Sequence, residues 1–176
     1  GPGVCLRLWS REMHHTLIPA HRPEILEVDL AGLALELALW GVDDPGQLKW
    51  LDPPPRSIFD SACDLLRSLG ALDLDGGITD QGRQMAALPM HPRLAHMLVA
   101  ADHLGYGEIA CDMAALLGER DVVRFDPGQQ DADIRIRLDL LQALRRKRPL
   151  IRQGATIDYS ALRRVIRSAD QLRRQL

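Results

Sequence analysis

The residues whose types and spacing best suit chemistry are basic side chains near the C-terminus. They fall into two groups: Arg145, Arg146, Lys147 and Arg148, then Arg163, Arg164 and Arg167. From Ile134 onward the sequence holds 12 Lys and Arg against 3 Asp and Glu, whereas the rest holds 10 against 21. Guanidinium groups donate in a planar fork that fits phosphate, and such a charge imbalance is typical of polyanion binding. The alternative is a solvated basic helix that pairs with the acidic body.

The helix dipole distinguishes the two groups. Residues 145–148 end a predicted helix, where the partial negative charge of the helix C-terminus stabilises cations and could account for much of this group. Arg163, Arg164 and Arg167 lie in the first half of the next helix, where the dipole disfavours them. The second group is therefore the better candidate for phosphate contacts, which would be weak, sequence-tolerant and strongly salt-dependent.

The sequence lacks motifs of nucleotide chemistry and gives little support for a metal site. No GxxxxGK[ST] phosphate loop is present. Of three histidines in one region, His91 and His96 are five residues apart, so a helix does not present them together. His91 is better placed to cap a helix. The three cysteines are odd in number and widely spaced, which indicates reduced thiols. We expect no catalytic site, cofactor or metal in this chain itself.

The elements that must position the arginines are predicted to be mainly helical. Apolar residues recur at helical spacing in seven segments: residues 30–40, 57–69, 80–88, 92–104, 109–117, 132–147 and 160–174. From Pro92 onward we expect only helices, a polar loop at residues 119–130 and a linker at residues 149–157, with Ser160 capping the last helix.

The same spacing predicts which side chains face the core. The stripes are Leu30, Leu33, Leu37 and Trp40 in the first helix, and Ile109, Met113, Leu116 and Leu117 in the fifth. In the last helix, apolar residues from Leu162 to Leu172 face one way, which leaves Arg163, Arg164, Arg167, Arg173 and Arg174 mostly on other faces.

Residues 65–101 are predicted to organise the chain. Gly70 follows one helix as a C-cap, and Asp75-Gly76-Gly77 supplies a turn between short strands at residues 71–74 and 78–79. Thr79 can then cap a helix that must end before Pro89, and Pro92 starts another. This order predicts a winged-helix domain with a short β-hairpin wing, followed by a helical bundle.

The helix at residues 57–69 is poorly suited to reading DNA. In winged-helix regulators the outer face of this third helix enters the major groove. Here that face carries Asp60, Ser61, Asp64, Arg67 and Ser68, which is net acidic. Because phosphate attraction dominates nucleic-acid affinity, we interpret this winged helix as a packing module.

The same stretch also resembles a known family. The segments LGALD, ITDQGRQMAALPMHPRLAHML and LLGERD resemble the helicase-associated C-terminal region of DEAH/RHA-type ATP-dependent RNA helicases, most like the bacterial HrpB type. The resemblance extends over roughly residues 23–144. It implies a region that packs on two RecA-like motor domains of the same chain and forms one wall of the channel for single-stranded RNA, or DNA. It also implies that ATP and Mg act in the motor of the parent helicase.

The resemblance further implies how the chain divides. Residues 1–22 would be a remnant of the second motor domain with a connector, residues 23–89 the winged-helix domain and residues 90–176 a ratchet-like helical bundle. VCLRLW at residues 4–9 would be a strand cut from its sheet.

A free-standing winged-helix regulator or protein-interaction adaptor is the alternative, and a basic third helix would distinguish it. No apolar run approaches a membrane span and no signal peptide is evident, so we expect a cytoplasmic protein without membrane contact.

Overall fold

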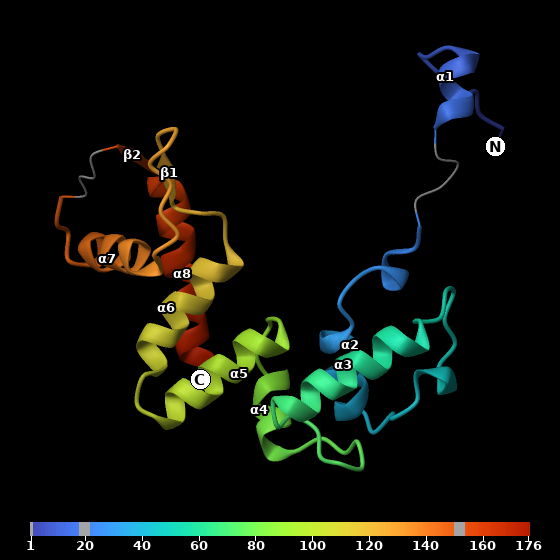
Figure 1. Ribbon diagram of the computed structural model, residues 1–176, viewed down its shortest axis with the longest axis horizontal. Helices are drawn as coiled ribbons and strands as arrows, with labels where there is room; N and C mark the ends of the chain where they lie inside the picture. The colour runs from blue at the N-terminus through green and yellow to red at the C-terminus, as the bar shows by residue number, and fades with distance from the viewer. Residues whose placement is uncertain (1, 18–21, 150–153) are drawn as a thin grey trace.

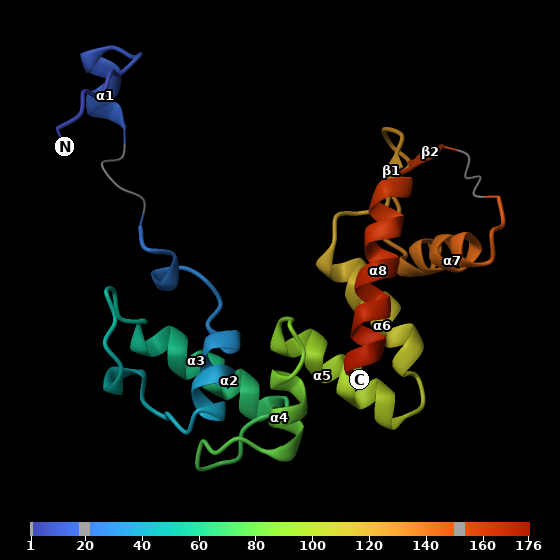
Figure 2. The same cartoon turned by 180° about the vertical axis from the view of Figure 1, so that it is seen from behind.

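The computed structural model describes residues 2–17, 22–149 and 154–176. Its α-helices are α1 (Arg11–Thr16), α2 (Ala31–Leu39), α3 (Arg56–Ser68), α4 (Asp80–Ala86), α5 (Pro92–His103), α6 (Gly107–Gly118), α7 (Ile134–Arg145) and α8 (Tyr159–Gln175). Short 3-10 turns are η1 (Glu24–Leu26) and η2 (Pro45–Gln47), and the strands are β1 (Val123–Phe125) and β2 (Ala155–Ile157). Helices α2 and α3 lie at one end, α4 and α5 in the middle, and α6 and α8 side by side at the other end (Figures 1 and 2). Within these ranges no helix is both long and apolar enough to cross a bilayer.

Helices α2 and α3 pack through apolar faces, and the predicted stripe of α2 is confirmed with one exception. Leu30 and Leu37 of the α2 stripe are buried, and α3 buries Phe59 and Leu66. The prediction for Trp40 is wrong, because its side chain is 69% exposed. Trp40 is the C-cap that follows Leu39, and the chain turns at Gly41, whose φ is +78°.

The wing is a hairpin, as predicted, but a minimal one. A single antiparallel bridge joins Leu72 and Ile78 in place of two extended strands. The Asp73 N–H donates to the Gly77 carbonyl at 2.9 Å. The Asp73 carboxylate accepts from the N–H groups of Asp75 and Gly77, at 2.9 and 2.7 Å. The Asp73 side chain therefore stabilises this turn, in which only one pair of residues forms a backbone bridge.

Replacing Gly76 and Gly77 together with Val should destabilise the chain by roughly 1–3 kcal/mol, the usual size of backbone strain and overpacking. Gly76 has φ +89°, which a β-branched residue adopts only with strain. A Cβ on Gly77 would lie 2.8 Å from Oδ2 of Asp73. Urea unfolding measures the loss. The control is Gly32→Ala on α2, which should lose no stability because a Cβ there meets nothing within 4 Å. An equal loss of stability in the control and in the Gly76 and Gly77 variant would contradict this role of the turn.

Local capping fixes the central helices as predicted. Thr79 accepts from the Gly82 N–H at 3.0 Å and starts α4. His91 is the N-cap of α5, where its Nδ1 accepts from the Arg93 N–H at 3.2 Å. The Nε2 of His91 lies 3.3 Å from Oδ2 of Asp29, whose Oδ1 caps α2 through the Ala31 N–H. That backbone hydrogen bond, followed by the one with His91, lowers the pKa of Asp29. The two caps join the start of α5 to the start of α2.

The prediction that only helices follow Pro92 is wrong. Strands β1 and β2 pair antiparallel, with Val123 opposite Ile157, in the segments expected to be a loop and a linker. Residues 150–153 of that linker lie outside the described residues. The cap of α8 is also corrected: Asp158, not Ser160, accepts from the N–H groups of Ser160 and Ala161, both at 2.9 Å. The hydrogen bonds from Ala161 and Ser160 lower the pKa of Asp158.

Helix α6 buries mainly small residues, and of the predicted stripe only Met113 and Leu116 are half-buried. Ile109 and Leu117 are 43% and 57% exposed, whereas four small residues are buried: Ala110, Cys111, Ala114 and Ala115. Both α5 and α8 pack against α6. Small side chains let helices approach closely, so the face with the smallest residues is the one covered.

The N-terminal segment makes no strand. Residues 4–9 are exposed and without regular structure, and no residue of α1 is buried. Part of the predicted connector forms α1, and residues 18–21 of it lie outside the described residues.

Deleting residues 1–10 should leave the melting temperature nearly unchanged, because none of residues 2–10 is buried. A thermal melt of the shortened chain measures this. A drop of more than about 4 °C, equivalent to about 1 kcal/mol for a chain of this size, would show that the segment belongs to the folded core.

Candidate nucleic-acid interface

Helix α8 separates an apolar face from a polar one. Its buried residues, among them Leu162, Val165 and Leu172, pack against the core that includes α6. The opposite side carries polar residues at spacings of three and four, which places them along one face: Arg164, Arg167, Ser168, Gln171 and Arg174. The arginines therefore point outward because the apolar stripe fixes the rotation of the helix.

All seven predicted basic residues are exposed or half-buried, and six of them lie outside the buried ion-pair network described below. Arg146, Lys147 and Arg148 follow α7 and are exposed, as are Arg163 and Arg167 of α8. Within the described residues no ion pair involves any of these five.

Arg164 is the sixth and is partly engaged. Its Nε lies 3.6 Å from Oε2 of Glu119, and its Nη1 lies 3.4 Å from the Ser160 hydroxyl. Both contacts are long, and the Arg164 side chain is 42% exposed. Its guanidinium group is therefore held loosely and remains accessible.

Arg145 lies instead in a network around a buried carboxylate. Asp112 on α6 is 5% exposed. Its Oδ2 lies 2.9 Å from Nη1 of Arg145, and its Oδ1 lies 2.7 Å from Nη2 of Arg173. Both arginines also contact Oδ1 of Asp170, at 3.2 and 2.6 Å. The network ties α6, α7 and α8 together, which gives Arg145 a structural role.

Arg173 corrects the prediction that it faces outward. It reaches from α8 to α6, where it also donates to the Glu108 carbonyl at 3.3 Å. The signal in the sequence was Asp112, a charged residue inside the apolar run IACDMAALL. Such a carboxylate requires a cation when the helix is covered on two sides.

Two adjoining hollows follow the polar face of α8. The larger, of about 610 Å³, is lined by Glu119, Arg164, Arg167, Ser168, Asp170, Gln171 and Arg174. The smaller, of about 290 Å³, is lined by Pro89, Met90, Leu94, Ala114, Ala115, Gly118, Glu119, Ser168, Gln171 and Leu172. Because they share Glu119, Ser168 and Gln171, we treat both as one feature, the α8 groove. Glu119 was not foreseen as part of the site.

The outer face of α3 contrasts with the α8 groove. Arg67 pairs with Asp64 at 2.8 Å. Arg56 pairs with Asp60 at 3.1 Å and with Asp44 at 2.8 Å. The cations on this face are therefore matched by carboxylates, and the face remains poorly suited to phosphate.

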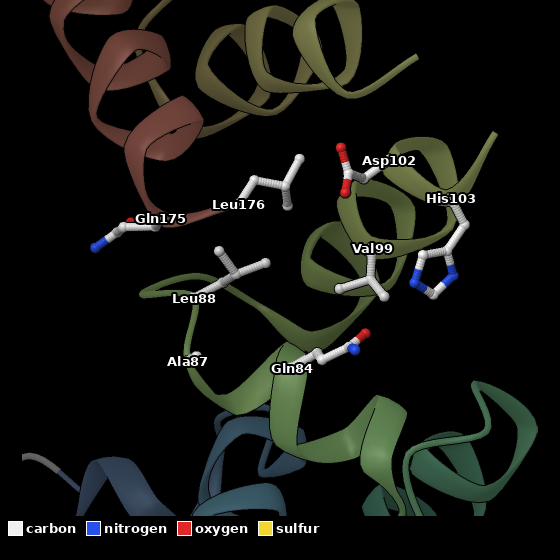
Figure 3. Close-up of a pocket in the computed structure, with 8 residues that line it drawn as sticks. All are labelled: Gln84, Ala87, Leu88, Val99, Asp102, His103, Gln175 and Leu176. Atoms are coloured by element: carbon white, nitrogen blue, oxygen red, sulfur yellow. The ribbon is translucent and has the colours of Figure 1, made fainter. Parts of the chain in front are cut away.

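A third hollow, of about 220 Å³, lies between α4, α5 and the end of α8 (Figure 3). Its lining residues are Gln84, Ala87, Leu88, Val99, Asp102, His103, Gln175 and Leu176. Among them Asp102 is the only carboxylate, and no Lys or Arg from the described ranges lines the space. Because it lacks these cations, this hollow is a poor match for phosphate. The described residues also contain no group of three His, Cys, Asp or Glu side chains that could hold a metal ion.

Comparisons with known proteins agree with the sequence motifs. Residues 64–90, which span the wing and α4, match the model of the helicase associated domain (HA2), winged-helix. The chain is 43% identical over 118 residues to ATP-dependent RNA helicase HrpB from Escherichia coli, which covers 67% of this chain. It is 34% identical over 135 residues to pre-mRNA-splicing factor ATP-dependent RNA helicase prp22 from Schizosaccharomyces pombe, which covers 76% of this chain.

Solved structures give the same result. A crystal structure of the Escherichia coli DEAH/RHA helicase HrpB superposes on 94% of this chain with a TM-score of 0.66 and 32% identity. A second, of the E. coli DExH-box NTPase HrpB, superposes on 91% with a TM-score of 0.58 and 34% identity. The chain covers 18% and 20% of these two structures. It covers 14% of the full length of HrpB and 12% of prp22. The chain therefore carries the helicase-associated region of a DEAH/RHA-type helicase.

Proposed function

We propose that this chain is the accessory region of an ATP-dependent RNA helicase and forms part of its channel for single-stranded RNA. The parent motor would bind ATP and Mg and hydrolyse the nucleotide, while this region has no catalytic site of its own. Residues 23–89 would act as the winged-helix domain and residues 90–176 as the ratchet-like bundle, after a motor-domain remnant at residues 1–22. The helicase would act in the cytoplasm.

The observation that carries this proposal is the contrast between two helical faces. The α8 groove presents arginines with weak described partners or none, such as Arg167 and Arg174. The outer face of α3 presents arginines that carboxylates neutralise. A strand backbone carries one phosphate per nucleotide, so it is attracted to the first face and not to the second.

Exposed apolar side chains support packing on the motor domains. Trp40 and Leu51 in the winged-helix half are 69% and 98% exposed, and Leu104 and Tyr106 at the α5–α6 corner are 73% and 65% exposed. Exposed apolar side chains that lie together mark surfaces that another domain covers, and Leu104 and Tyr106 are two residues apart at one corner. In this family the covering partner would be the RecA-like motor domains of the same chain.

Binding of a fluorescent single-stranded RNA, followed by anisotropy over a salt series, tests the proposal. Binding should be independent of sequence, and the logarithm of the association constant should fall with the logarithm of salt with a slope of about −2, as expected for three phosphate contacts on a single strand. DNA single strands should also bind. Tighter binding to duplex DNA with a preferred sequence would favour the free-standing winged-helix regulator instead.

A further inference from the structure

The chemistry of the α8 groove changes in order along its length. One end is mainly cationic, with Arg164, Arg167 and Arg174. Its one other charged side chain among the described residues, apart from Glu119, is Asp170, which is paired with Arg145 and Arg173. The middle, which both hollows share, holds hydrogen-bonding side chains that are not cationic: Glu119, Ser168 and Gln171. The other end is mainly apolar, with Pro89, Met90 and Leu94 from the α4–α5 turn and the start of α5.

A nucleotide unit has the same order of chemistry: an anionic phosphate, a sugar with hydroxyl groups, and a base with flat apolar faces. Resting on the function proposed above, we infer that the α8 groove seats a nucleotide with its ribose at Glu119, so that the groove prefers RNA to DNA. Phosphate then faces the arginines, and the base packs against Met90 and Leu94.

Glu119 is suited to recognise the ribose 2′-hydroxyl. A carboxylate only accepts hydrogen bonds, and the 2′-hydroxyl is a donor that DNA lacks. The described ion pair of Glu119 is the 3.6 Å contact with Nε of Arg164, and its side chain is 32% exposed. Acceptor capacity therefore remains on a side chain that lies where the two hollows meet.

The same carboxylate works against DNA. A strand without the 2′-hydroxyl brings its phosphates near a negative charge and gains no hydrogen bond in return. The desolvation of this half-exposed carboxylate without a new donor and the charge repulsion both lower affinity. Discrimination by Glu119 thus combines a bond made with RNA and a repulsion that remains with DNA.

Binding of oligo(U), oligo(dU) and 2′-O-methyl oligo(U) to the whole chain tests this inference. The unchanged chain should bind oligo(U) about tenfold more tightly than the other two, the ratio expected for one charge-assisted hydrogen bond. Glu119→Ala should bring all three within about twofold, mostly by strengthening the two that lack the donor, because only oligo(U) loses a bond. Glu119→Gln keeps an acceptor oxygen and should keep part of the preference. Glu108→Ala removes an exposed carboxylate in the first turn of α6, the helix that Glu119 follows, and is the control that should keep the ratio.

Equal oligo(U) to oligo(dU) ratios in the unchanged chain and Glu119→Ala would overturn the inference, because Glu119 would then only reduce the positive charge. In that case the proposed function would still hold if replacing the α8 arginines with Glu abolishes binding of single strands. Absence of binding to any single strand would overturn both.

Discussion

Replacing Arg163, Arg164 and Arg167 together with Glu should abolish binding of single-stranded RNA at low salt, a loss of about 100-fold or more. Three attractions to phosphate become three repulsions, and the attraction to the backbone supplies most of the affinity of such surfaces. The fold should persist, because Arg163 and Arg167 are exposed and no ion pair within the described residues involves them. Fluorescence anisotropy measures binding, and circular dichroism with a thermal melt measures folding.

A matched control separates local contact from net charge. Replacing Arg11, Arg22 and Lys49 with Glu makes the same change in net charge at exposed positions outside the helical bundle. At about 0.1 M salt, where the Debye length is about 10 Å, this control should weaken binding by no more than about threefold, since more distant charges are screened. Equal losses in both triple variants would mean that only overall charge matters and that α8 is not the contact surface.

Replacing Asp112 with Ala should lower the free energy of unfolding by roughly 2–4 kcal/mol, because removing one partner of a buried ion pair leaves the others uncompensated. Among the described residues, the partly exposed Asp170 would be the only carboxylate left to Arg145 and Arg173. Urea unfolding measures the loss. Asp139→Ala on α7, an exposed carboxylate, is the control and should change stability little.

A rescue variant tests the cause of that loss. Replacing Asp112, Arg145 and Arg173 together with apolar residues of similar volume should recover more than half of the stability, since buried ion pairs are often replaceable by apolar packing. Failure to recover, with the single variant strongly destabilised, would show that the network is needed for more than charge compensation. A loss below about 0.5 kcal/mol for Asp112→Ala would contradict the role of the network altogether.

Features that depend on a few consecutive residues were predictable. The caps at Asp29, Thr79 and His91 follow from side chains that hydrogen-bond a backbone group two or three residues away. The wing turn follows from Asp75-Gly76-Gly77, because glycine adopts conformations that other residues avoid. At the last helix the same logic chose the wrong cap, since both Asp158 and Ser160 can serve and the choice depends on where β2 ends.

Features that depend on distant pairing were not predictable. Strand β1 is three residues long, which is too short for a period to be visible, and it pairs with residues 30 to 34 positions later. Arg173 and Asp112 lie 61 residues apart in the chain and meet only because α6 packs on α8. Among the candidate site residues, Arg163, Arg164 and Arg167 were predicted from their place on a helix, and their contact with nucleic acid stays a prediction. Glu119 was missed because it lies in a segment expected to be a polar loop.

The most direct test of the central claim, that α8 and not the winged helix contacts nucleic acid, is site-specific photocrosslinking. A photoreactive amino acid is placed at Gln171 in the α8 groove or at Ser61 on the outer face of α3, two exposed polar positions. Labelled single-stranded RNA is then irradiated with each variant at low salt. The account predicts a crosslink at Gln171 that unlabelled RNA competes away, and none above background at Ser61. A crosslink at Ser61 as strong as that at Gln171, or one at Ser61 alone, would contradict it.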